Sequence, residues 1–79
     1  MDTGMLEYRL ALVERQMVDA ERYVTLRRDN LIRLELDGLG RSPTAEIARD
    51  RLRQMEDKLR RHSAERKQLQ AELRRARAA

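Results

Sequence analysis

The sequence contains no cysteine, which excludes disulfide bonds and thiolate chemistry. It also contains no Phe or Trp and only two Tyr, so a globular core built on aromatic rings is excluded. We find neither a cationic apolar leader nor an apolar run long enough to cross a bilayer. From these absences we expect a cytoplasmic protein without membrane insertion.

Patterns typical of enzymes are missing as well. No Gly-rich phosphate loop follows a strand, no Ser has a candidate base beside it, and no paired carboxylates occupy a plausible pocket. The Gly-Leu-Gly segment at residues 38–40 is typical of a helix end. We therefore expect no enzyme activity, no catalytic residue, no metal site and no cofactor.

Charge is what the sequence has in abundance, since 41% of its 79 residues are Asp, Glu, Lys or Arg. This composition is typical of a long helix or coiled coil. Because so short a chain buries little surface, we also expect it to oligomerise. The charge is unevenly distributed: residues 1–40 carry 6 basic and 8 acidic side chains, whereas residues 41–79 carry 12 and 6.

The segment "LDGLGRSPT" is the only strong helix breaker. Gly38 and Gly40 can adopt the left-handed conformation after a helix, and Ser42 with Pro43 forms a cap and first-turn pair for the next helix. The sequence therefore predicts a single helical hairpin. Its expected elements are a helix at about 3–37, a turn at 38–42 and a helix at about 43–77.

Apolar residues recur in alternating steps of four and three along both predicted helices, which favours a coiled-coil seam. Of the 18 positions that these steps select, 15 are apolar, whereas an overall frequency of 41% would give about 7. Folding the chain at the turn pairs seam residues whose numbers sum to 82 or 83, such as Leu10 with Leu73. The predicted seam consists of Leu6, Leu10, Val13, Met17, Ala20, Val24, Arg27, Leu31 and Leu34 on the first helix, and Ala48, Leu52, Met55, Leu59, His62, Arg66, Leu69, Leu73 and Ala76 on the second.

The residues that flank the seam test this register independently, because antiparallel helices place equivalent flanks against each other. All of the resulting charge pairs have opposite signs, so the sequence predicts an all-α fold, an antiparallel two-helix hairpin of the coiled-coil type. Each surface pair contributes only about 0.2–1 kcal/mol and specifies register more than stability. The predicted pairs are Glu35–Arg49, Arg28–Glu56, Glu7–Arg77 and Arg9–Glu72, with Tyr23 beside Lys58.

Three seam positions are polar, namely Arg27, His62 and Arg66. His62 is expected to face Ala20, where a bulky ring opposite a small side chain conserves volume; polar seam residues commonly fix register or partner number. A phosphoacceptor histidine would have to face solvent, which disfavours phosphotransfer. No other His or Cys completes a metal site with His62 and Glu65, although a dimer could bring two copies of His62 together.

The first helix has a second apolar face on the side away from the seam. Leaving it in water would forfeit roughly 1.5–3 kcal/mol per large side chain, so we expect a partner to cover it. A second copy would give a homodimeric four-helix bundle, and a larger protein with a groove for this helix is the alternative. This outer apolar stripe consists of Met5, Tyr8, Leu12, Val18, Leu26, Ile32 and Leu36.

The outward side of the second helix carries cations that recur every seven residues. Such a stripe is suited to a phosphate backbone or to an acidic protein or membrane surface, and it also keeps a helix solvated. The lack of helix-turn-helix spacing and of aromatic residues argues against sequence-specific nucleic-acid recognition. This basic stripe consists of Arg53, Arg60, Arg61, Lys67, Arg74 and Arg75.

The segments "AERY" (20–23), "RLELDG" (33–38) and "LRQMEDKLRRHSAERKQL" (52–69) carry one further pattern. In it a leucine precedes a Met-Glu pair, and a His-x-x-x-Arg motif precedes a final leucine run. With this pattern the chain resembles a group of small, uncharacterised bacterial helical-hairpin proteins of unknown function. The resemblance implies a hairpin fold and a bacterial, cytosolic setting, and no activity. The matching residues are Leu52, Met55, Glu56, His62, Arg66 and Leu69.

Three functional hypotheses follow. We expect a non-enzymatic structural and protein-interaction module that forms a homodimeric helical bundle. One alternative is a basic nucleic-acid-associated protein that uses the basic stripe, and the other is a helix-in-groove adaptor for a larger protein. The first and third differ only in what covers the outer apolar stripe.

Overall fold

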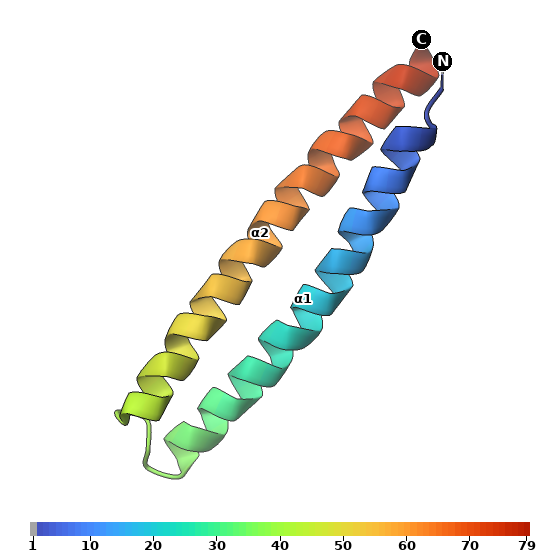
Figure 1. The fold of residues 1–79 in the computed structure, drawn as a ribbon. Coiled ribbons are helices and arrows are strands. Elements are labelled where there is room, and N and C mark those ends of the chain that lie inside the picture. Colours follow the sequence, from blue (N-terminus) through green and yellow to red (C-terminus); the bar gives the residue numbers. More distant parts are fainter. Residues whose placement is uncertain (1) are drawn as a thin grey trace.

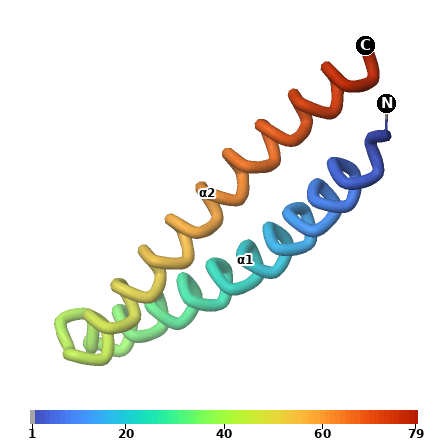
Figure 2. The backbone as a smooth tube through the Cα atoms, turned by 45° about the horizontal axis from the view of Figure 1, so that its top comes forward, coloured from blue at the N-terminus to red at the C-terminus, as the bar shows by residue number. Residues whose placement is uncertain are grey.

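The computed structural model describes residues 2–79 and consists of two long helices joined by a short turn (Figure 1). Helix α1 spans Gly4–Leu36 and helix α2 spans Pro43–Ala78. The helices run antiparallel, so both chain ends lie at one end of a rod with extents of 58 × 14 × 13 Å. Figure 2 shows them side by side from a second direction. The predicted all-α hairpin is confirmed.

Thr3 is the N-cap residue of helix α1, and its side chain makes no capping hydrogen bond. An Asp2 carboxylate oxygen, one residue further out, accepts the Gly4 N–H at 2.8 Å. The Thr3 hydroxyl instead donates to the Glu7 carboxylate at 2.9 Å. This hydrogen bond, together with one from Arg77 of α2, lowers the pKa of Glu7.

The turn closes α1 with a Schellman motif. Gly38 has a φ of 78°, in the left-handed region that a side chain disfavours. The Leu39 N–H donates to the Leu34 carbonyl at 2.8 Å, and the Gly38 N–H donates to the Glu35 carbonyl at 3.1 Å. These two bonds satisfy carbonyls that the helix leaves without partners at its end. The chain reverses here because a glycine stands where the left-handed residue is needed.

Gly40 does not share this conformation, so its predicted left-handed geometry is wrong. A Cβ atom at position 40 would lie 3.3 Å from Cγ of Glu35, a tight contact with a flexible side chain. Arg49 donates to the Gly40 carbonyl and makes no ion pair with Glu35. The predicted Glu35–Arg49 pair is therefore wrong, because the turn places a carbonyl acceptor nearer to this guanidinium.

Helix α2 begins as its sequence predicts. The Ser42 hydroxyl accepts the Ala45 N–H at 3.2 Å, and Pro43 occupies the first turn. Ala45 is fully buried, although the predicted seam begins only at Ala48. Position 45 is seven residues before Leu52, so the same spacing extends the seam by one further residue.

The left-handed glycine gives a first prediction. Replacing Gly38 with alanine is expected to cost about 1–2 kcal/mol of unfolding free energy, because Cβ then meets the following carbonyl. Gly40→Ala is the matched control in the same turn, and its flexible neighbour Glu35 can move aside. Urea unfolding followed by circular dichroism measures both variants. Equal losses for the two variants would contradict this account of the turn.

The hydrophobic core of the hairpin lies along the seam. Val13, Met17 and Leu69 form its buried cluster, and all 18 predicted seam residues are at least partly buried. Other residues of α1 along this length are exposed, apart from Thr3 at its cap. The core is thus a single line of side chains between two helices. The residues that pack against the cluster are Leu6, Leu10 and Leu59.

Two ion pairs on the flanks confirm the register. Arg28 pairs with Glu56 at 2.9 Å, and Arg77 pairs with Glu7 at 3.2 Å, both as predicted. In the part of the chain that the structure describes, the predicted pair of Arg9 with Glu72 is not formed. Because one ion pair lies near the middle of the rod and the other near its open end, the alignment holds along most of its length.

Candidate functional site

The apolar surface of the hairpin belongs mainly to α1. All seven residues of the outer apolar stripe are exposed, from 43% for Leu12 to 81% for Leu36. On α2 the exposed large apolar side chains of residues 43–78 are limited to Ile47. Since the seam uses the other side of α1, this helix is apolar on two faces.

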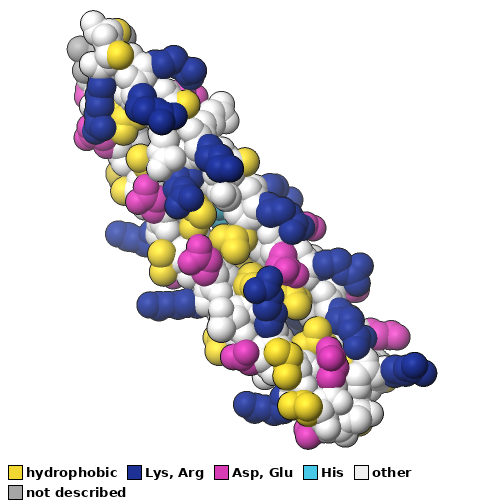
Figure 3. Space-filling model, turned by 180° about the vertical axis from the view of Figure 1, so that it is seen from behind, with side chains coloured by type: hydrophobic (Ala, Val, Ile, Leu, Met, Phe, Trp, Pro, Cys, Tyr) yellow, Lys and Arg dark blue, Asp and Glu magenta, His cyan; other side chains and the backbone are white. Residues whose placement is uncertain are grey.

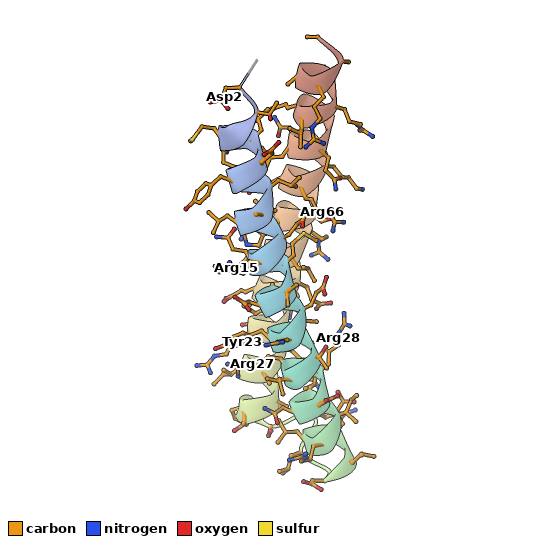
Figure 4. All side chains as sticks on the ribbon, turned by 90° about the vertical axis from the view of Figure 1, so that its right-hand side faces the viewer. Asp2, Arg15, Tyr23, Arg27, Arg28 and Arg66 are labelled. Carbon is orange, nitrogen blue, oxygen red and sulfur yellow. The ribbon has the colours of Figure 1, made fainter. Side chains whose placement is uncertain are left out.

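The outer apolar stripe is interrupted by charges, which the sequence-based interpretation overlooked. Tyr8, Arg15, Arg22, Asp29 and Leu36 recur every seven residues, or about two helical turns, and so form one exposed row along the outer face. Apolar side chains stand at both ends of this row and charged ones in its middle. Figure 4 views α1 from this side and labels Arg15. The seven-residue spacing of these charged residues is the sequence signal that indicates the interruption.

A shallow hollow lies near the middle of the same face. Val18, Thr25 and Leu26 contribute its apolar lining, and Glu21 and Arg22 contribute charges of opposite sign. All five side chains come from α1, so the hollow does not depend on the packing of α2. It offers an apolar contact bordered by both signs of charge.

The basic stripe is divided by acidic neighbours on its own helix. Arg53 pairs with Asp50 at 3.3 Å, and Arg60 pairs with Asp57. Their three-residue spacing signals such pairs on a helix. In the C-terminal half of α2, Arg77 pairs with Glu7 and Arg66 is partly buried, whereas the four other cations are exposed and make no ion pair among residues 2–79. Figure 3 shows one face of the rod, with Lys and Arg side chains along its whole length and Asp and Glu side chains among them. This C-terminal basic patch consists of Arg61, Lys67, Arg74 and Arg75.

The polar seam residues are partly buried without full satisfaction. Nε2 of His62 and Nε of Arg66 are buried and have no hydrogen-bond partner in the described chain. His62 borders one hollow with Ala20, and Arg66 borders another with Met17, as the register predicts. An unpaired buried nitrogen costs about 1–3 kcal/mol, so these side chains weaken the middle of the seam.

Arg27 is the third polar seam residue, and an aromatic ring lies near its guanidinium. Its guanidinium carbon stands 6.0 Å from the centroid of the Tyr23 ring, at the limit of a cation–π contact. Figure 4 shows Tyr23 and Arg27 together on one side of α1 and Arg28 on the other. The tyrosine ring thus lies near the guanidinium of an arginine that the seam does not fully enclose.

Among residues 2–79, no three His, Cys, Asp or Glu side chains converge to form a metal site. Among the helices described, none has the length and apolarity to cross a membrane.

Comparison with known proteins gives no match: no family model fits the chain, and neither a curated protein nor a solved structure is similar to it. The resemblance to bacterial helical-hairpin proteins therefore stays a prediction. Functional inference rests on the two outer faces of the hairpin.

Proposed function

We propose that this chain is a non-enzymatic interaction module that forms a homodimer through the outer apolar stripe of α1. Two hairpins would then make a four-helix bundle with the α1 helices inside and the basic α2 helices outside. The observation that carries this proposal is the exposure of all seven stripe residues on a helix whose opposite face already forms the seam. Covering a large apolar side chain contributes roughly 1.5–3 kcal/mol.

A second copy is the partner that fits best, because the central row of α1 is complementary to itself. Residues 8 and 36, and residues 15 and 29, are equidistant from Arg22. If two α1 helices pack antiparallel about a two-fold axis at Arg22, Tyr8 meets the partner's Leu36 and Arg15 meets the partner's Asp29. A two-fold interface requires this kind of self-complementarity.

The axis itself brings two copies of Arg22 together, which is unfavourable. Glu21 lines the same hollow as Arg22 on each helix and provides opposite charge beside the axis. Val18 and Leu26 also line this hollow, so apolar contacts surround the charged centre. The expected interface has apolar ends, ion pairs further in and a charged middle.

Charging the stripe tests the proposal. The double variant Leu26→Glu with Ile32→Lys is expected to be monomeric, whereas the natural chain is expected to be a dimer whose mass does not depend on salt. Gln54→Glu with Gln68→Lys is the control, because it adds the same charges at exposed positions of α2. Sedimentation equilibrium over about a hundredfold range of concentration measures the mass. A natural chain that is monomeric, or a charged variant that stays dimeric, would refute the homodimer.

Charge reversal tests the antiparallel register separately. Arg15→Asp and Asp29→Arg are each expected to weaken the dimer, because each places like charges opposite each other. The variant that combines both reversals is expected to recover the dimer. Both residues are exposed, so the hairpin itself is expected to fold in every variant. If the combined variant dimerised no more strongly than the single variants, this register would be ruled out. Self-association itself is tested separately by the variants that charge the stripe.

A further inference from the structure

In the C-terminal half of α2, exposed cations flank a row of small side chains. This row consists of Ala64, Ala71 and Ala78, which recur every seven residues along the outward side of the helix. By helical position, Lys67 and Arg74 lie on one side of the alanine row and Arg61 and Arg75 on the other. Alanine projects little, so a ligand can approach the helix backbone between the two rows. The four residues span about 21 Å at 1.5 Å per residue.

The acidic residues of this segment make no ion pair with the patch among residues 2–79, although Glu65 follows Arg61 by four residues and Glu72 precedes Arg75 by three. Residues 61–79 contain six Lys or Arg and only two acidic residues, Glu65 and Glu72. Both glutamates are partly buried on the flank toward α1, whereas all four cations of the C-terminal basic patch are exposed. In the N-terminal half of α2, Asp50 and Asp57 occupy the helical positions that alanines occupy in the C-terminal half, because positions 50, 57, 64, 71 and 78 are spaced by seven residues. The four cations of the C-terminal basic patch are therefore unpaired, whereas Arg53 and Arg60 in the other half are paired.

The helix dipole explains only part of this distribution. Cations in the last turn stabilise a helix C-terminus, and Arg75 lies in that turn. The effect falls off within one turn, so it gives no reason for Arg61 or Lys67. A general need for solvation does not explain why the four patch cations are unpaired either. In the first half of α2, charges that form ion pairs also keep the outward face of the helix polar.

We infer that the C-terminal basic patch binds the phosphate backbone of double-stranded nucleic acid without reading its sequence. Both tyrosines are on α1, so α2 has no aromatic ring on which a single-stranded base could stack. A membrane surface is less suitable, because this half of α2 exposes no large apolar side chain to insert. Four exposed cations within about 21 Å of one helix can each contact a phosphate of a duplex, which carries one charge per about 1.7 Å of its axis. The patch is separate from the outer apolar stripe, so this inference is independent of the proposed dimer.

Fluorescence anisotropy with a labelled duplex of about 20 base pairs of mixed sequence tests the inference. Each phosphate contact contributes about −0.9 to the slope of log K against log salt, so four contacts predict about −4 per hairpin. Lys67→Gln with Arg74→Gln is expected to reduce that slope by about 2. At about 50 mM salt it is expected to weaken binding on the order of a hundredfold.

Arg53→Gln with Arg60→Gln is the matched control, because it removes the same charge from residues that are already paired. Its affinity is expected to stay within severalfold of the natural chain. Equal losses in both double variants would overturn the inference, since binding would then follow net charge alone. Undetectable duplex binding at low salt would overturn it too, as would binding only to vesicles of phosphatidylserine and phosphatidylcholine. Circular dichroism verifies that each variant stays helical.

Discussion

Replacing Leu69 with alanine is expected to leave most of the chain unfolded at room temperature. Leu69 is 2% exposed and packs with Val13 and Met17 in the buried cluster. Truncating a buried leucine costs about 2–5 kcal/mol, the sum of lost burial and the cavity that remains. A two-helix hairpin has little stability beyond this amount, because its core is a single seam. The loss of far-UV helical signal and a shift of the urea midpoint measure the effect.

The control for this change is Ile47→Ala, at a position of α2 where the side chain is 53% exposed. Surface substitutions of this kind change stability by about 0.5 kcal/mol or less, and alanine favours a helix more than isoleucine does. Ile47 also lies outside the outer apolar stripe and the C-terminal basic patch. Comparable losses in the two variants would mean that the seam does not carry the stability of the hairpin.

Replacing His62 with leucine is expected to act in the opposite direction. The imidazole is partly buried and its Nε2 has no partner, so leucine removes an unsatisfied group and extends the apolar seam. We expect a gain of about 1–3 kcal/mol in the unfolding free energy. We also expect a broader range of assembly states, because a polar seam residue restricts register and partner number. Urea unfolding and sedimentation velocity measure these two effects.

The variant His62→Gln tests whether the gain in stability comes from removing a polar group from the seam. Glutamine keeps a polar group in the seam, so it is expected to give no increase in stability. The neighbouring Arg66 retains its own unpartnered Nε in both variants and does not distinguish them. If leucine and glutamine gave the same stability, the buried nitrogen would not be what weakens this part of the seam.

The architecture could be predicted from the sequence because one periodic pattern determines it. Steps of four and three place the seam on one face of each helix, and the breaker around Gly38 permits only one position for the reversal. The pairs Arg28–Glu56 and Glu7–Arg77 were predictable because the register fixes which flanking residues meet. Neither the hairpin nor its register depends on the detailed positions of the side chains.

Predictions failed where local competition among polar groups decides the outcome. Arg49 turns to the Gly40 carbonyl because the turn brings an acceptor that helical periodicity does not describe. The pairs of Arg53 and Arg60 with aspartates of their own helix, in contrast, follow from their three-residue spacing, and they reduce the number of unpaired cations on the basic stripe. The interruption of the outer apolar stripe was missed for a different reason, since counting apolar positions does not reveal the charges between them.

The turn and the buried cluster around Leu69 lie toward opposite ends of the rod. Seam partners next to the turn, such as Leu34 and Ala48, are 14 residues apart in the chain, whereas Val13 and Leu69 are 56 apart. Loop closure favours the nearby pair first, but that pair includes a small alanine and neither member is fully buried. We therefore expect folding to nucleate weakly at the turn and to zip along the rod, with most of the stabilisation gained only as the two chain ends meet.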